Sequence, residues 1–526
     1  LLKQWLREPL ISKKAISQRQ ECVKELVKNK MILSEIRKHL KEISDCNRIL
    51  SKISLNKVNP RDLLSLSKSL SSIQIIKGII EKDKLKGLGF FNNKIKDSSE
   101  VEIVISETIK DDPNVNINKG GFVKDGYCPK LDELRLISKD ANNWLIKYQE
   151  DLKKTLAISS LKINYNKIFG YYIEITKTHI NKIPNFFIRK QTLVNSERFY
   201  TSDLKEFELK ILNAQDNIVG LENEYFEKLK KQILKKINII HYNILIISKI
   251  DIFTCFAKNA IENNYVCPEM NNSNKIDLRG SRHPVIESLL DAGSDFITND
   301  IKIDKNNYQI AIITGPNMAG KSTFLRQIGL IVLLSQIGSF IPAKKGNIGI
   351  VDRIFTRVGA SDNLALGEST FLVEMIEVAN ILNNCTGKSL ILLDEVGRGT
   401  STYDGLAIAW AIIEYIHNSN RKAKTLFATH YHELIDLAEK LKRGFNLNVL
   451  VKEYKDKIIF LHKIKKGSSN KSYAINVAKM AGIPNEVIIR SQSLLNKFTA
   501  NSNTVNSDLI ENKESNQQLP LFNNFK

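Results

Sequence analysis

The stretch YQIAIITGPNMAGKSTFLRQIG, residues 308–329, joins an apolar run to a segment with helical spacing through a glycine-rich loop. Gly315, Gly320, Lys321 and Ser322 match the pattern G-x-x-x-x-G-K-[ST], which is typical of a phosphate-binding loop between a strand and a helix. The backbone N–H groups of such a loop and the dipole of the following helix favour bound phosphate. The stretch therefore predicts an α/β nucleotide-binding domain.

The motif predicts roles for individual residues of the loop. Lys321 would reach the β and γ phosphates, and the Ser322 hydroxyl would ligate Mg²⁺. The residues expected around the nucleotide are Gly315, Pro316, Asn317, Met318, Ala319, Gly320, Lys321, Ser322 and Thr323.

A second motif, SLILLDEVGRGTSTYDG (389–405), places two acids after four apolar residues. The acids would lie at the end of a buried strand, where parallel sheets place their ligands. Asp394 would hold the metal, and Glu395 would orient or deprotonate the attacking water. A third apolar run, TLFATH, ends at His430. A lone histidine is more often structural, but its place at a strand end predicts a γ-phosphate sensor or a water-positioning group.

The rest of the chain changes its periodicity several times. Helical spacing dominates the first part, as in AISQRQECVKELV (15–27). Alternating residues in LKINYN and YYIEIT predict a hairpin at 161–176, and helical spacing resumes near residue 203. Strand candidates at 309–314, 389–394 and 424–429 alternate with helices, which predicts a parallel sheet. The expected organisation is helical at 1–155, a β insertion at 156–212, helical at 213–265, α/β at 266–500 and a disordered tail at 501–526.

Composition limits the location and the partners. The formal net charge of +21 indicates a polyanionic partner, but an AT-rich genome would also give a Lys-rich chain, and both readings stay open. The six cysteines lack metal-ligand spacing, which predicts reduced thiols in the cytoplasm. No signal peptide is recognisable at the start. The most apolar stretch, 237–253, is interrupted by Asn, His, Lys and Asp, so a buried helix is expected and no membrane association.

Four motifs together carry a specific resemblance. TGPNMAGKST, GESTFLVEM (367–375), LLDEVGRGTSTYDG and FATHYHEL (427–434) occur in this order and resemble the ATPase domain of the MutS family of DNA mismatch-repair proteins. The likeness continues upstream through GGFVKDGYCPKLDELR (120–135), LKINYNKIFGYYIEIT (161–176), RKQTLVNSERF (189–199) and SRHPVIE (281–287). It implies a multidomain protein with a mostly α-helical core and lever, a small β clamp insertion, and an ABC-like P-loop ATPase domain that also dimerises.

The resemblance also implies roles for single residues, with ATP and Mg²⁺ as cofactors. Ser369 would reach across a homodimer to the γ-phosphate in the partner's site. Phe296 and His462 would sandwich the adenine, although a core phenylalanine and a surface histidine are the simpler alternatives. Asn317 would contact phosphate or the attacking water.

The clamp insertion is expected to grip double-stranded DNA. Residues 161–200 contain an excess of basic side chains over two acidic ones, Glu174 and Glu197. The seven basic residues are Lys162, Lys167, Lys177, Lys182, Arg189, Lys190 and Arg198. We expect Lys177, Arg189, Lys190 and Arg198 to contact DNA phosphates, which positions the duplex without reading its sequence. The alternative is a solvated basic face.

The chain departs from the family in one respect. Members that find mismatches carry an N-terminal Phe-x-Glu motif, and no phenylalanine here is followed two residues later by glutamate. The mismatch-reading and connector domains are therefore expected to be missing, either because Leu1 begins a fragment or because the gene has lost them; the start at Leu1 favours the fragment.

The expected function is an ATP-dependent mismatch-repair protein that binds DNA as a dimer and uses ATP to switch its clamp state. A MutL-type partner is implied as well. A short family member that clamps DNA junctions without reading mismatches is the alternative. The family branch with a C-terminal nuclease is disfavoured, because it lacks the clamp insertion.

The tail contains one apolar cluster, in QQLPLF (517–522). It resembles the Q-L-x-L-F peptide with which bacterial repair proteins bind the replication sliding clamp. Gln518 would make the polar contact, and Leu519, Leu521 and Phe522 the apolar ones.

Overall fold

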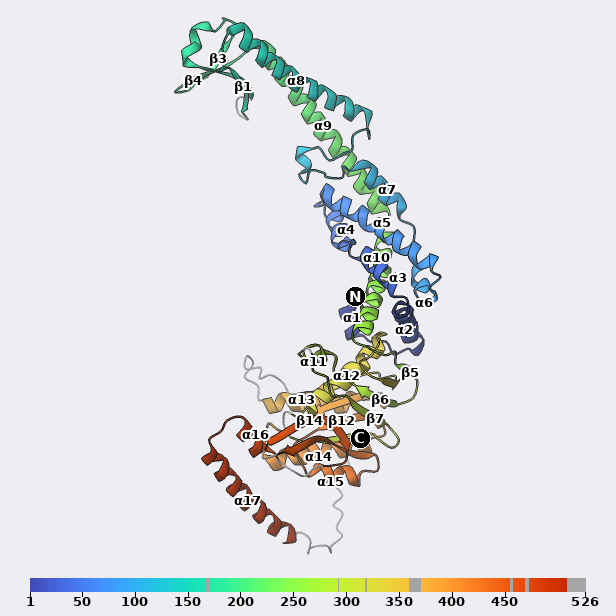
Figure 1. Cartoon of the computed structure of the whole chain (residues 1–526). Helices are drawn as coiled ribbons and strands as arrows, with labels where there is room; N and C mark the ends of the chain where they lie inside the picture. Colours follow the sequence, from blue (N-terminus) through green and yellow to red (C-terminus); the bar gives the residue numbers. More distant parts are fainter. Residues whose placement is uncertain are drawn as a thin grey trace, which may run out of the picture. The chain divides into compact units, whose positions relative to one another are not determined.

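The structure is a computed structural model that describes residues 1–166, 170–291, 293–316, 319–358, 370–454, 457–468 and 473–508. Two compact units are present. The first contains Leu1 and Glu25–Cys255, and the second contains Leu2–Lys24 and the residues from Phe256 onward. Helices α2 (Lys13–Lys28) and α10 (Ile237–Glu262) contribute residues to both units (Figure 1).

Residues 2–24 belong to the second unit, although the sequence places them in one helical region with residues up to 155. Ile16 is fully buried in the core of the second unit, and Leu10 N–H donates to the carbonyl of Gln336 at 3.1 Å. The Arg19 guanidinium donates to the carbonyl of Ile337 at 3.0 Å. These contacts connect residues more than 300 positions apart, which local periodicity cannot predict.

The first unit is mostly helical. Asn59 and Pro60 begin the longest helix before residue 100, with a capping box between Asn59 and Asp62. Its helices are α3 (Lys30–Leu40), α4 (Cys46–Ser54), α5 (Pro60–Lys82), α6 (Lys86–Asn92), α7 (Ser99–Thr108), η1 (Ile117–Lys119), α8 (Pro129–Leu156) and α9 (Ser202–Lys235).

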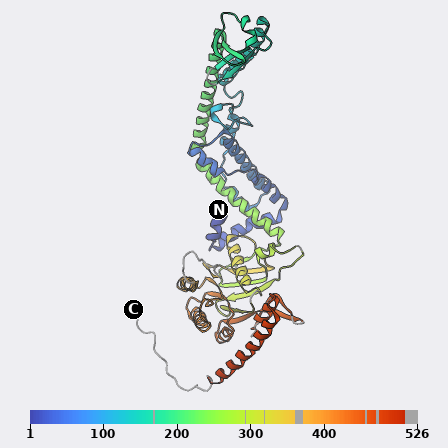
Figure 2. The same cartoon turned by 90° about the vertical axis from the view of Figure 1, so that its left-hand side faces the viewer.

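A four-stranded antiparallel sheet lies between α8 and α9 in the chain and at their shared end in space (Figure 2). Its strands are β1 (Lys162–Asn166), β2 (Gly170–Thr176), β3 (Ile188–Thr192) and β4 (Ser196–Tyr200), in the order β1-β2-β4-β3, with η2 (Lys177–Lys182) after β2. The predicted hairpin is confirmed, since β1 pairs with β2 and Ile163 lies opposite Ile173. Buried residues of the sheet pack on Leu152, Leu156 and Leu204 of the two helices.

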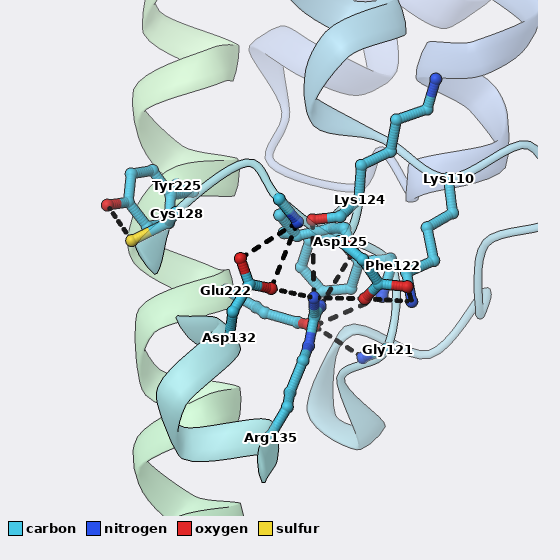
Figure 3. Close-up of polar contacts among 12 residues, drawn as sticks. Lys110, Gly121, Phe122, Lys124, Asp125, Cys128, Asp132, Arg135, Glu222 and Tyr225 are labelled. Carbon is cyan, nitrogen blue, oxygen red and sulfur yellow. Dashed lines mark hydrogen bonds and ion pairs between the residues drawn. The ribbon is translucent and has the colours of Figure 1, made fainter. Parts of the chain in front are cut away.

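A buried carboxylate joins the first turns of α8 to α9 (Figure 3). The Glu222 side chain on α9 has no exposed surface, and its Oε2 accepts from the N–H groups of Gly121 at 2.6 Å and Phe122 at 3.3 Å. Arg135 on α8 donates to Glu222 at 2.7 Å and also to Asp125 at 2.7 Å. One acid therefore holds two helices and a glycine turn together.

The second unit contains two sheets. The strands of the larger one follow the order β10-β11-β12-β8-β13-β14, and its first five strands run parallel, as predicted from the three apolar runs. These strands are β8 (Ile310–Thr314), β10 (Ile354–Arg357), β11 (Leu390–Asp394), β12 (Lys424–Ala428), β13 (Gly444–Tyr454) and β14 (Lys457–Lys466). The smaller sheet contains β5 (Glu269–Asn271), β9 (Lys345–Gly349), β6 (Lys275–Ser281) and β7 (Asn299–Asp304).

Alternate residues of the central strands belong to two different hydrophobic cores, one on each face of the sheet. Ala311 and Ile313 of β8 pack with α12 and the smaller sheet, whereas Ile310 and Ile312 pack with α13, α14 and α15. Helices on both faces explain why these strands are apolar throughout. The helices are α1 (Leu2–Arg7), α11 (Pro284–Ser288), α12 (Lys321–Ile337), α13 (Thr370–Asn384), α14 (Thr402–Asn418), α15 (Leu434–Lys440), α16 (Ala474–Met480) and α17 (Asn485–Asp508).

Helix α17 continues to Asp508, past residue 501 where the disordered tail was expected to begin. Extending an existing helix by one residue fixes few torsions for each hydrogen bond gained, so polar residues can follow an established helix.

Among the described residues, α5 and α10 are long and apolar enough to span a membrane by length and composition alone. Their most apolar windows are 56% and 50% buried within the protein. Core helices of soluble proteins have the same composition, so these helices are weak evidence for a membrane. The apolar stretch at 237–253 lies within α10.

Candidate functional site

The phosphate-loop motif lies between strand β8 and helix α12 at the carboxyl edge of the larger sheet. Gly315 has φ +142° and Gly320 has φ +106°, a backbone conformation that L side chains rarely adopt. A Cβ at position 315 would also approach the Val449 Cβ at 3.2 Å. Both glycines are therefore needed to turn the chain from the strand into the helix.

Lys321 begins α12 and folds back over the loop. Its ammonium group donates to the carbonyls of Gly315 at 2.6 Å and Pro316 at 3.1 Å. Burial lowers the pKa of Lys321, while the nearby charges of Glu395 and Asp394 oppose that shift. An anion that replaced those two carbonyls would contact the ammonium group of Lys321, which is partly desolvated.

Asp394 ends strand β11 and lies beside Ser322. Burial raises the pKa of Asp394, and a hydrogen bond with the Ser322 side chain opposes this shift. The buried Asp394 Oδ1 has no hydrogen-bond partner among the described residues. An orphaned carboxylate oxygen beside a hydroxyl fits Mg²⁺, which takes one or two protein oxygens and completes its shell with phosphate and water. Within the described ranges, no group of three or more His, Cys, Asp or Glu could hold a metal by itself.

Glu395 has φ +52°, in the left-handed region that non-glycine residues rarely occupy. Its N–H donates to the carbonyl of Ala428 at 2.9 Å, and its carboxylate forms a 2.7 Å ion pair with Arg398. Backbone strain of this kind costs about 1–3 kcal/mol and is concentrated at functional sites. The following turn is held by Glu374, which accepts from the N–H of Gly397 at 2.6 Å.

His430 lies two residues beyond the end of β12, next to Tyr431 at a ring-centroid distance of 4.2 Å. The residue is exposed at the surface, yet the protein shields part of the ring, and this desolvation lowers the pKa of His430 against the attraction of Glu395. The direction of this shift favours the neutral imidazole, which can donate one hydrogen bond and accept another.

A cavity of about 310 Å³ lies among these groups. Its lining consists of Pro316, Gly320, Lys321, Ser322, Thr323, Glu395 and Arg398. Residues from the loop after β8 and the turn after β11 thus meet at one edge of the sheet, as expected from the order of the parallel strands.

A second cavity of about 240 Å³ shares Gly320 and Thr323 with the first. Phe296 and His462 both line it, which brings together two rings 166 positions apart in the chain. His462 has φ +49°, and its Nδ1 lies 3.0 Å from the carbonyl oxygen of Ala319, so Nδ1 carries the proton and donates it. Two aromatic faces beside a phosphate loop suit a flat base.

The four basic residues expected to contact DNA differ in their surroundings. Lys177 is exposed at the start of η2. Arg189 is 57% exposed but pairs with Glu197 at 2.8 Å. Lys190 lies at an irregularity in the β3–β4 register, with its ammonium group 5.3 Å from the Tyr200 ring centroid. Arg198 is 18% exposed and donates to Gln191 Oε1 at 2.9 Å, so its charge is used largely inside the sheet.

Several expected site residues lie outside the described part of the chain. They are Asn317, Met318, Ser369, Gln518, Leu519, Leu521 and Phe522.

The two cavities include residues that were not expected at the site, among them Arg398, Asn299 and Gln327. Arg398 lines the phosphate-side cavity, and its position in GRGTS after the acidic pair could have indicated it. Asn299 and Gln327 line the base-side cavity. Neither belongs to a phosphate-binding pattern, so only the folded arrangement shows their place.

Two family models match the chain. One, described as MutS domain III, covers residues 1–257, and one described as MutS domain V covers residues 311–499. Similar proteins include those named DNA mismatch repair protein MutS from Flavobacterium johnsoniae (46% identical over 99% of this chain), Clostridium novyi (47% over 98%) and Halothermothrix orenii (46% over 99%). The aligned regions cover 60%, 57% and 61% of those proteins, so the chain spans about three fifths of their length.

Proposed function

The chain belongs to the MutS family, and from that premise we propose that it binds ATP with Mg²⁺ in the two adjoining cavities and hydrolyses it in DNA mismatch repair. The observation that carries the proposal is the meeting of Lys321, Ser322 and Glu395 around one cavity that adjoins the Phe296–His462 cavity. A nucleotide would then place its triphosphate in the first cavity and its base in the second.

We assign the phosphate contacts to the loop residues 315–323 and the metal to Ser322 and Asp394. Bound Mg²⁺ supplies charge neutralisation for the β and γ phosphates. Asp394 must be ionised for this role, and the burial that raises its pKa also leaves Oδ1 unpaired for the cation. The ammonium group of Lys321 would exchange the carbonyls of Gly315 and Pro316 for phosphate oxygens.

We assign to Glu395 the role of orienting or deprotonating the attacking water. Its backbone has a strained positive φ at the end of the strand. Its carboxylate forms an ion pair with Arg398 at 2.7 Å. An incoming polyphosphate would compete for the Arg398 guanidinium and thereby free the carboxylate to act on water. His430 and Asn317 are the further candidates for contact with the γ-phosphate or the water.

The four-stranded sheet β1–β4 is proposed to bind the DNA backbone through Lys177, Arg189 and Lys190. The formal net charge of +21 supports a polyanionic partner. DNA-stimulated hydrolysis, switching of the DNA-binding state by ATP and action as a homodimer with Ser369 in trans belong to the same proposal. So do a MutL-type partner and a sliding-clamp contact through Gln518, Leu519, Leu521 and Phe522.

Two substitutions test the ATP site. Lys321→Ala removes a ground-state phosphate contact, so it should weaken nucleotide binding. Glu395→Ala removes the group that acts on water, so it should leave ATP binding intact and slow single-turnover hydrolysis by at least a hundredfold. Lys302→Ala is the matched control, because Lys302 is exposed in the same unit and lines neither cavity. Equal loss of binding in Lys321→Ala and Glu395→Ala would contradict the assigned roles.

A further inference from the structure

A buried carboxylate on α13 bonds the turn that follows Glu395. The Glu374 side chain is 6% exposed, and its Oε1 accepts from the N–H of Gly397 at 2.6 Å. Gly397 is two residues beyond Glu395 in the chain. Neither Glu374 nor Gly397 is among the residues that line the two cavities of the nucleotide site. The contact therefore lies behind the lining of the site.

The other oxygen of Glu374 contacts an arginine. Arg357, at the end of β10, is 8% exposed and donates to Glu374 Oε2 at 3.3 Å. Its Nε also lies 3.3 Å from Glu377 Oε2, one turn further along α13. Removing one member of a buried ion pair is costly because the remaining charge has no partner. The ion pair with Arg357 therefore offsets the cost of burying Glu374 and leaves Oε1 directed at Gly397.

Both groups that face the Glu374 carboxylate are hydrogen-bond donors. The backbone N–H of Gly397 and the guanidinium of Arg357 each need an acceptor. A glutamine at position 374 would turn its amide nitrogen, which is also a donor, towards one of them. Glu374→Gln therefore breaks one of the two contacts while it preserves the size and shape of the side chain.

The carbonyl of Gly397 is held as well. The Tyr431 hydroxyl donates to it at 3.1 Å, and Tyr431 is 4% exposed. Burial raises the pKa of Tyr431 and the charge of Glu374 adds to the shift, so the hydroxyl keeps its proton and can donate it. A strained backbone such as that of Glu395, with φ +52°, persists only where the surrounding structure holds it. The two bonds to Gly397 provide such a hold.

We propose that Glu374 is a positioning residue for Glu395: by holding the N–H of Gly397, it keeps the strained turn in the conformation that presents the Glu395 carboxylate to the attacking water. This inference rests on the proposed function, because it assumes that Glu395 acts on water during ATP hydrolysis. Glu374 itself touches neither the nucleotide nor the water. Its loss should therefore slow hydrolysis and leave ATP binding unchanged.

The test measures ATP affinity by equilibrium titration and hydrolysis by single-turnover kinetics. Glu374→Gln should bind ATP within about twofold of the wild type and hydrolyse it about tenfold or more slowly, because a small misplacement of reacting groups is enough for such a loss. In the Glu395→Ala background, the same substitution should change the rate by less than about twofold, since the group that Glu374 positions is gone. A purely structural role would slow both backgrounds alike.

Glu377→Gln is the matched control on the same helix. The Glu377 side chain is 45% exposed, and among the described contacts it pairs only with the arginine that Glu374 also contacts. This variant should keep the wild-type rate. Tyr431→Phe removes the other bond to Gly397, so it should also slow hydrolysis with ATP binding retained, and it decides the matter if Glu374→Gln does not fold.

Three results with Glu374→Gln would overturn the inference: a wild-type rate of hydrolysis, weakened ATP binding, or a tenfold loss of rate that persists in the Glu395→Ala background. A wild-type rate in Tyr431→Phe would overturn it where Glu374→Gln does not fold. A wild-type chain that does not hydrolyse ATP would instead overturn the proposed function.

Discussion

Replacing Glu222 by alanine should loosen the joint between α8 and α9 far more than replacing other acids on α9. The Glu222 side chain is completely buried, and its carboxylate holds the Gly121–Phe122 turn and Arg135 at once. Alanine leaves two backbone N–H groups and one guanidinium contact without their acceptor. Glu222→Gln keeps one acceptor oxygen and should lie between alanine and the wild type.

The loss of stability in Glu222→Ala depends on which contacts Arg135 keeps. Removing one partner of a buried ion pair costs about 3–5 kcal/mol because the other charge is stranded. Here Arg135 keeps Asp125 at 2.7 Å and the carbonyl of Val123 at 2.8 Å, so the lower end, about 3 kcal/mol, applies. Glu224→Ala is the matched control, because Glu224 on the same helix is 58% exposed and pairs only with Lys228 in the described contacts. Exposed pairs of this spacing contribute little to stability because solvent screens them.

Hydrogen exchange read by mass spectrometry measures the difference locally, which matters because one global unfolding energy is not defined for a two-unit chain. Peptides containing Gly121, Phe122 and the start of α8 should exchange about a hundredfold faster in Glu222→Ala, since each 1.4 kcal/mol is tenfold. Glu224→Ala should change protection by less than threefold. Equal protection in the two variants would refute the reasoning that Glu222 carries this joint.

Three further predictions concern other parts of the chain. Lys177→Ala with Arg189→Ala should weaken duplex DNA binding for all sequences alike and lower the slope of log affinity against log salt by about one per lost contact, as measured by titration at several salt concentrations. Burial lowers the pKa of Lys424 from 10.5 to about 8, so the folded state loses this proton first and stability should rise between about pH 8 and 10.5. Lys424→Met should abolish this rise and add up to about 3 kcal/mol at pH 7 to the stability of the second unit, measured in urea by proteolysis at sites within that unit. A peptide of residues 512–526 should bind a bacterial sliding clamp, and Leu521→Ala with Phe522→Ala should abolish that binding; equal binding would contradict the role of the tail.

The sequence predicts the parts of this molecule that depend on local pattern. The phosphate loop needs glycines at fixed spacing, and the strands β8, β11 and β12 are apolar runs that end in polar residues. The β1–β2 hairpin follows from a period of two on both sides of a turn. Each of these signals lies within about twenty residues, where backbone geometry and side-chain direction are set by neighbours along the chain.

Features that depend on distant contacts were not predictable. Arg198 counts as a basic residue in the sequence, but Gln191 and Glu174 take up its charge within the sheet. Residues 2–24 have the periodicity of the helices that follow them, yet their apolar face packs on the second unit through Ile16. Helical period shows which face of a helix is apolar and does not show which core that face joins.

One histidine connects the two cavities at the nucleotide site, because His462 lines one cavity and bonds the phosphate loop beside the other. His462 donates from Nδ1 to the carbonyl of Ala319 in the phosphate loop, while the Asn299 side-chain amide donates to the backbone carbonyl of His462. A shift of the loop on phosphate binding would move the acceptor of the histidine ring and so the face offered to the base. Base and phosphate binding should therefore be coupled: Asn299→Ala should weaken ADP more than inorganic pyrophosphate, which reaches only the phosphate side. Equal weakening of both ligands would show that Asn299 supports the fold as a whole and does not position the base face.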